Sequence, residues 1–208
     1  MQDPQDLWGE RGRPTPRQLL FDVLVAGVFT LLGFVTAIQQ SVPAIVGTLA
    51  MGLALAVRRL SWPAMAVLAA ATGACQLVGG ELVLLADLGY AGVFFVLGAH
   101  PRAAVRRFGL VGAIGSAAVL AAMVGLDTVE AVSGVSTAFA VAGSASLAAL
   151  VAGGGWAAGY LRWQTRARIT AQVRAGLEQE RTRIAADMHD LVAHTWACLL
   201  YTSDAADE

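Results

Sequence analysis

The chain has 208 residues, of which 57% are apolar and only 14% are charged. A typical soluble domain carries about 25% charged residues, so this composition excludes an ordinary soluble protein and indicates several membrane spans. The formal net charge of −1 conceals a segregation of Arg into particular loops, and it therefore says nothing about partners. All 14 basic residues are Arg, which is typical of GC-rich bacterial genomes. Cys75 and Cys198 are the two cysteines, too few for a disulfide framework or a Cys-based metal site.

Residues 1–18 are polar and rich in Pro and Arg, and we expect a flexible cytosolic lead. Six apolar segments follow within 19–161 and meet or approach the roughly 17 to 20 residues that a membrane helix needs. Pro43 and Pro63 support the second and third, because Pro is tolerated in the first turn of a helix. The predicted fold class is therefore all-α, a six-span transmembrane bundle. The segments are 19–38, 42–57, 62–78, 82–97, 108–126 and 138–161.

The positions of Arg orient these spans, because cytoplasmic loops are enriched in basic residues. Arg occurs in the N-terminal lead, in 58–59, in 102–107 and directly after 161, whereas the alternate loops 39–41, 79–81 and 127–134 contain none. Six spans with both termini in the cytoplasm satisfy this pattern, and five spans would place the arginines of the tail outside. We expect a multi-pass protein of a bacterial inner (plasma) membrane.

Asp22 and Asp87 lie within apolar runs, where carboxylates are candidates for functions such as proton relay. In the six-span arrangement Asp22 is near the inner end of the first span and Asp87 near the outer end of the fourth, so they cannot pair with each other. The favoured interpretation is that both lie at the membrane surface in contact with water. Gly155 and Gly159 form a G-x-x-x-G pattern, which weakly supports close helix packing.

The composition changes at 162–197 to Arg, Gln and Glu with regularly spaced apolar residues. This spacing predicts a continuous cytosolic amphipathic helix whose apolar stripe is close to a coiled-coil seam and is interrupted near Glu180 and Arg181. A helix with one apolar stripe is expected to pair with a second copy, which predicts a homodimer. The stripe consists of Ile169, Val173, Leu177, Ile184, Met188 and Leu191.

The strongest candidate site lies on this helix at His189. His189 follows Met188 of the stripe by one residue, about 100° of helix rotation, so it should lie at the flank where another domain can reach it. Asp190 can accept a hydrogen bond or a proton from the imidazole while the other ring nitrogen attacks a phosphoryl group. The alternative of a metal site with His194 is disfavoured, since residues five apart on a helix point about 140° apart. No metal site is predicted.

The block Arg183-Ile184-Ala185 followed by Asp187-Met188-His189-Asp190 resembles the phosphoacceptor segment of sensor histidine kinases of the third dimerisation subgroup. The resemblance implies that His189 is the phosphorylated histidine and Asp190 the residue that assists proton transfer. Arg183, Asp187 and His194 match recurring positions of that family.

The resemblance also implies the partners and cofactors of the protein. ATP and Mg²⁺ would be bound by a separate domain, and the phosphoryl group would pass to an Asp of a response regulator. The chain itself would contact the lipid bilayer and a second copy but not nucleic acid.

Only 19 residues follow His189, and no nucleotide-binding motif is among them. We therefore expect this fragment to be inactive as a kinase and its parent to be active. Residues 198–208 leave the amphipathic pattern and look like the translation of a transposase-based sequencing adapter. The source DNA across codon 198 tests this origin, because a continuous genomic sequence there would contradict it.

Two other functions compete with the kinase hypothesis. A small multispanning transporter or channel-like protein with a cytosolic oligomerisation helix is favoured by Asp22, Gln76 and Asp87. A structural membrane anchor is the third possibility, and the gene's downstream sequence distinguishes it.

Overall fold

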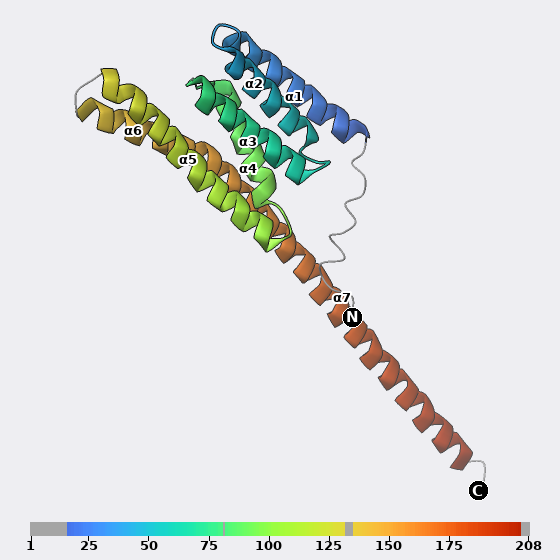
Figure 1. Ribbon diagram of the computed structural model, residues 1–208. Helices are drawn as coiled ribbons and strands as arrows, with labels where there is room; N and C mark the ends of the chain where they lie inside the picture. The colour runs from blue at the N-terminus through green and yellow to red at the C-terminus, as the bar shows by residue number, and fades with distance from the viewer. Residues whose placement is uncertain (1–15, 81, 132–134, 205–208) are drawn as a thin grey trace. The chain divides into compact units, whose positions relative to one another are not determined.

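A computed structural model describes residues 16–80, 82–131 and 135–204, without the side chains of residues 85, 124–131, 135–137, 190 and 193–204. All regular structure in these ranges is helical, which confirms the all-α prediction. The elements are α1 (Pro16–Ala37), α2 (Val42–Val57), α3 (Trp62–Gly79), α4 (Leu84–Gly98), α5 (Ala103–Ala131), α6 (Val135–Ala148), the π-helical turn η2 (Ala149–Gly153) and α7 (Gly154–Asp204) (Figure 1). The chain divides into two units, Met1–Trp163 and Gln164–Glu208.

Four helical stretches are long and apolar enough to cross a membrane, namely Pro16–Ala37, Trp62–Gly79, Ala103–Met123 and part of Ala138–His189. Val42–Val57 and Ala86–Gly98 are shorter apolar helices. Large apolar side chains on the outside of the first unit are exposed, including Leu31, Val67 and Ile114. A surface of this kind is unfavourable in water and favourable against lipid, so the first unit is compatible with a membrane location.

Local signals define the ends of the first helices as expected. The Ser41 and Ser61 hydroxyl oxygens accept hydrogen bonds from the backbone N–H groups of Ala44 and Ala64, and each is followed by a Pro in the first turn. Such caps satisfy backbone donors that the helix leaves unpaired. Gly80 ends α3 with a φ of 66°, a left-handed conformation that glycine adopts without strain.

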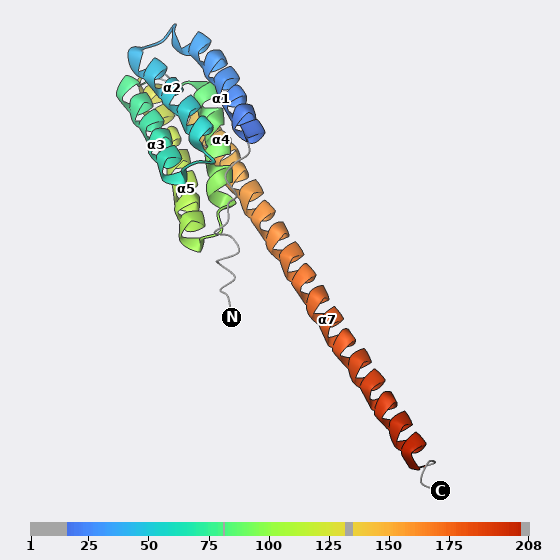
Figure 2. The same ribbon diagram turned by 90° about the vertical axis from the view of Figure 1, so that its right-hand side faces the viewer.

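Helix α4 is the centre of the first unit, because it contacts α1, α2, α3, α5 and η2. Helix α2 packs against both α1 and α3, and the two views show these three helices side by side (Figure 1, Figure 2). Small residues allow the close approach of α2 and α3: Gly47 lies against Thr72 and Cys75, and the Thr72 hydroxyl donates a hydrogen bond to the Gly47 carbonyl at 3.0 Å. The contact between α2 and α3 is thus built from small side chains and an internally bonded hydroxyl, as in membrane bundles.

Several predicted boundaries differ from the structure, among them the start of α1 at Pro16, three residues earlier than expected and within the predicted flexible lead. Helix α5 begins at Ala103 and ends at Ala131, so Arg106 and Arg107 lie in its first turns and not in a loop. Helix α4 begins at Leu84, two residues later than expected. The predicted sixth span is α6, η2 and the start of α7 in succession, and the π-helical turn, which periodicity does not reveal, interrupts the α-helical hydrogen bonding. Helix α7 is continuous to Asp204, so the interruption near Glu180 concerns the apolar stripe alone.

The start of α7 is held within the first unit by glycines and aromatic rings. Gly155 and Gly159 lie against the backbone of Ala91 and Phe95 in α4, where neither position has room for a β-carbon. The Trp156 indole N–H donates a hydrogen bond to the Arg106 carbonyl at 2.9 Å. The G-x-x-x-G pattern therefore marks a real contact between helix backbones.

Replacing Gly159 by Ala is expected to destabilise the protein by about 1–3 kcal/mol, the usual cost of overpacking, because the new methyl group would overlap the Phe95 carbonyl oxygen. Gly154→Ala is the matched control, since nothing lies within 4 Å of its β-carbon position. Reversible unfolding in mixed detergent micelles measures both. Equal stability of the two variants would contradict the packing argument.

Candidate functional site

All five residues of the predicted phosphoacceptor block, Arg183, Asp187, His189, Asp190 and His194, lie on α7 in the second unit. The side chains of Asp190 and His194 are outside the described residues. A single uninterrupted helix places Asp190 next to His189 at about 100° of rotation and His194 about 140° away from it.

Arg183 and Asp187 are one helical turn apart, and the Arg183 Nε lies 4.0 Å from the Asp187 Oδ2. The side chains are 75% and 73% exposed, and exposed pairs of this kind contribute at most a few tenths of a kcal/mol. The pair therefore does little for stability. Its charges remain available to another molecule that approaches this part of the helix.

The His189 side chain is exposed. Exposure is what a phosphoacceptor needs, since a nucleotide carried by another domain must reach the imidazole in line with its γ-phosphate. The described residues contain no group of three or more His, Cys, Asp and Glu side chains that could hold a metal ion. The described part of the tail therefore presents an exposed imidazole on a polar helix.

The apolar stripe of α7 is uncovered in the single chain. Its members are each more than half exposed, although they occur on an otherwise charged helix. A continuous apolar stripe on a polar helix normally packs against another helix. The exposed members are Ile169, Val173, Leu177, Ile184, Met188 and Leu191.

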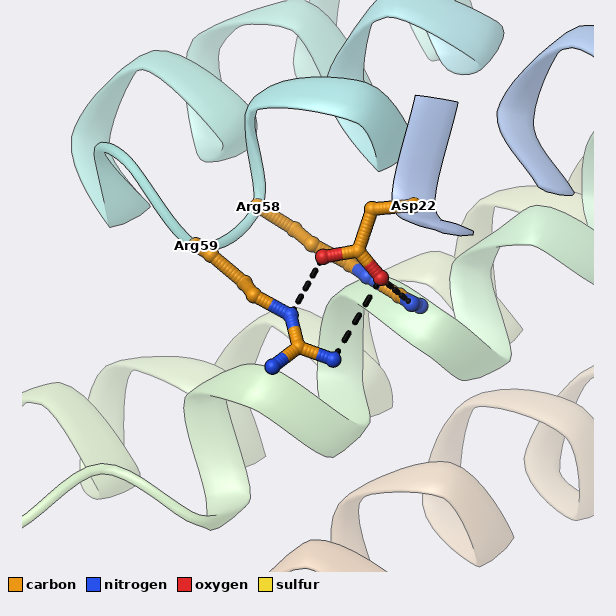
Figure 3. A network of polar contacts seen from close by, with 3 residues as sticks. All are labelled: Asp22, Arg58 and Arg59. Carbon is orange, nitrogen blue, oxygen red and sulfur yellow. Dashed lines mark hydrogen bonds and ion pairs between the residues drawn. The ribbon is translucent and has the colours of Figure 1, made fainter. Parts of the chain in front are cut away.

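Asp22 in α1 forms a buried ion-pair cluster that the sequence reasoning missed. Its side chain is 1% exposed, so the expectation that Asp22 contacts water is wrong. Arg58 Nη2 lies 2.5 Å from Asp22 Oδ1, Arg59 Nη2 lies 3.4 Å from the same oxygen, and Arg59 Nε contacts Oδ2. Figure 3 shows both guanidinium groups directed at the carboxylate, which pairs both of its oxygens.

The signal for this cluster was present in the sequence. The predicted topology places Asp22 and the Arg58-Arg59 loop at the same end of the bundle, and consecutive helices usually pack together. A carboxylate in an apolar run is therefore expected to pair with two arginines that lie at the same end of the bundle.

A second polar pair joins α3 to α4. The Gln76 side-chain N–H donates a hydrogen bond to Asp87 Oδ1 at 2.8 Å, and Gln76 is buried. Asp87 is only partly buried, and its direct partner is an amide and not a cation. The sequence reasoning named both residues but did not connect them.

Comparison of the chain with models of known protein families, with curated proteins and with solved structures finds no match.

Proposed function

We propose that this chain is the membrane sensor region and the beginning of the phosphoacceptor helix of a two-component sensor histidine kinase. The observation that carries the proposal is the Arg183 to Asp190 block on an uninterrupted helix with His189 exposed. An apolar helical unit precedes it, and together they have the order of parts expected of a membrane sensor.

In the proposed reaction one ring nitrogen of His189 attacks the γ-phosphorus of ATP. A nitrogen–phosphorus bond forms, the bond to the β,γ-bridging oxygen breaks, and ADP leaves. The proton on the other ring nitrogen passes to Asp190, which lies next in the chain, so the phosphorylated imidazole does not carry a full positive charge. The phosphoryl group then moves to an aspartate of a response regulator.

ATP and Mg²⁺ are assigned to a domain that would follow in the parent protein. The charged side chains described next to His189 are Arg183 and Asp187, which are already within 4.0 Å of each other. One guanidinium cannot orient a triphosphate and its metal, which generally require several converging donors. The α7 segment is therefore the substrate of the kinase and not its catalytic domain.

The kinase assay for this proposal uses the parent protein in its membrane. Incubation with γ-labelled ATP is expected to label the protein, with phosphate that is lost in acid and stable in alkali. Labelling that resists acid would indicate a hydroxyl acceptor and contradict the proposal. ATP-independent solute flux without any labelling would favour the transporter hypothesis.

We also propose that α1, α2, α3, α4, α5 and the α6–η2–α7 segment each cross a bacterial inner membrane, with both ends of the chain in the cytoplasm. The support is the alternation of Arg-containing and Arg-free loops. Helices α2 and α4 have 16 and 15 residues, short for a span, and their ends can reach the interface only where the bilayer thins.

Single cysteines test this topology in a variant without Cys75 and Cys198. A cysteine at Gln40 is expected to react in intact cells with a maleimide that cannot cross the membrane, and a cysteine at Leu60 is expected to react only after the cells are opened. Reaction at Leu60 in intact cells, or equal reaction at both positions, would contradict the six-span arrangement.

The exposed stripe of α7 supports a homodimer. Val173→Glu with Leu177→Glu is expected to lower the yield of crosslinked dimer by about tenfold or more, because each buried Val or Leu contributes about 1.5–3 kcal/mol. Ala175→Glu with Gln179→Glu is the matched control, since each lies about 200° around the helix from Val173 or Leu177. Crosslinking of intact membranes measures the yield, and a monomer in the unmodified protein would contradict the proposal.

A further inference from the structure

A cleft of about 540 Å³ lies within the first unit, between α3 on one side and α5, α6 and η2 on the other. Its volume is in the range of small-molecule sites. Helix α4 forms its floor with the buried side chains of Val93, Phe94 and Leu97. The lining is almost entirely apolar.

The cleft exists because one face of α3 carries small side chains. Ala66, Ala70, Gly73 and Ala74 recur at helical spacing and all line the cleft. Larger residues at these positions would fill the space. The small size of these side chains on one face of α3 therefore leaves the cleft open.

The polar side chains of the lining are hydrogen-bonded within the protein, and Asp87 is the one carboxylate among them. The Ser116, Ser144 and Tyr90 hydroxyls donate to backbone carbonyls. Asp87, at the end of the cleft near the start of α4, accepts a hydrogen bond from Gln76 through one oxygen. No ion pair joins Asp87 to any residue in the described part of the chain.

The partners of Asp87 differ from those of Asp22, the other carboxylate in an apolar run of this chain. That carboxylate contacts two guanidinium groups, because an unpaired charge in an apolar environment is costly. Asp87 lies in an apolar cleft with an amide as its direct partner. Its missing counter-charge can come from a ligand, and a cation would be complementary to it.

We propose that this cleft binds a lipophilic cation. The apolar body of the ligand lies between α3 and α5 on the floor of α4, and its ammonium or phosphonium group faces Asp87. This proposal concerns binding alone and does not depend on phosphotransfer by His189.

The test uses the whole chain in nanodiscs of zwitterionic phosphatidylcholine, with tritiated tetraphenylphosphonium as the probe. Saturable binding is expected, and Asp87→Asn should weaken it about 10-fold to 100-fold, as for loss of one charged partner. Asp87→Glu keeps the charge and should retain most of the affinity. Unlabelled tetraphenylborate, which has the same shape and the opposite charge, should not compete at concentrations below the solubility of its salt with the probe.

Two variants distinguish binding of the probe in the cleft from binding on the outer surface of the protein. Ser116→Phe places a ring in the cleft and should abolish binding with Asp87 intact, whereas Ile114→Phe alters an exposed residue outside the lining and should not. Circular dichroism and size-exclusion profiles show which variants are folded. If the Asp87 variants do not fold, the Ser116 variant and the borate competition decide the question.

Three results would overturn the proposal. They are equal binding by the unmodified protein and a folded Asp87→Asn variant, equal competition by tetraphenylborate, and no saturable binding above that of empty nanodiscs. The last result would mean that lipid acyl chains alone occupy the cleft.

Discussion

Replacing His189 by Gln in the intact parent protein is expected to reduce ATP-dependent labelling to the background of the assay. Glutamine is polar and of similar size, but its amide nitrogen has no basic lone pair with which to attack the γ-phosphorus. Asp190→Asn should leave the nucleophile in place and slow labelling by about 10²–10⁴-fold, the usual contribution of a positioned proton acceptor. Phosphate release in acid and in alkali measures the bond type in each variant.

Gln179→Ala is the control for these variants, because Gln179 is exposed on the same helix and lies outside the block. It should label at the rate of the unmodified protein. Acid-labile phosphate that persists in the His189→Gln protein would refute the site. An Asp190→Asn protein that labels at the normal rate would leave His189 as the acceptor but remove the proton-transfer role of Asp190.

Replacing Asp22 by Asn is expected to cause the largest loss of stability, about 3 kcal/mol. Asparagine keeps the shape of the side chain but leaves Arg58 and Arg59 without a negative charge, and breaking a buried pair typically costs about 3–5 kcal/mol. We expect the lower end of this range because the arginines are 23% and 42% exposed and keep part of their hydration. Reversible unfolding in mixed detergent micelles measures the free energy.

Asp187→Asn is the matched control, since it removes a carboxylate from an exposed pair with Arg183 and should cost less than about 0.5 kcal/mol. The double variant Asp22→Asn with Arg59→Gln should recover part of the stability lost in Asp22→Asn, because one of the two uncompensated cations is removed. With the Arg59→Gln single variant measured as well, the coupling energy of the pair is the cost of the double variant minus the costs of the two single variants. Equal stability of the Asp22 and Asp187 variants would contradict the assigned role of the cluster.

Much of the secondary structure could be predicted because its causes are local. Apolar runs, Pro43 and Pro63 in first turns, and the left-handed Gly80 define helices without reference to the rest of the fold. The helical setting of the predicted phosphoacceptor block was predictable for the same reason, since His189 and its neighbours are contiguous on one helix. The start of α5 was expected at residue 108 although Pro101 lies two residues before its first residue, because the prediction followed the apolar run and excluded the arginines.

The pairings between helices could not be read in this way. Asp22 was expected to contact water and instead contacts Arg58 and Arg59, 36 and 37 residues further along. Asp87 and Gln76 were each noted alone, and the cleft that connects them to α5 and α6 was not foreseen.

The physical reason is that some properties depend on residues close together in the sequence and others on residues far apart in it. Whether a segment is helical and whether it prefers lipid depend on the composition of that segment, so the amino-acid order alone was enough to predict the all-α architecture and the exposed histidine helix. Which side chains meet inside the bundle depends on which helices are neighbours and how each is rotated about its axis. The Asp22 cluster, the backbone contacts of Gly155 and Gly159, and the Asp87 cleft are all consequences of that packing.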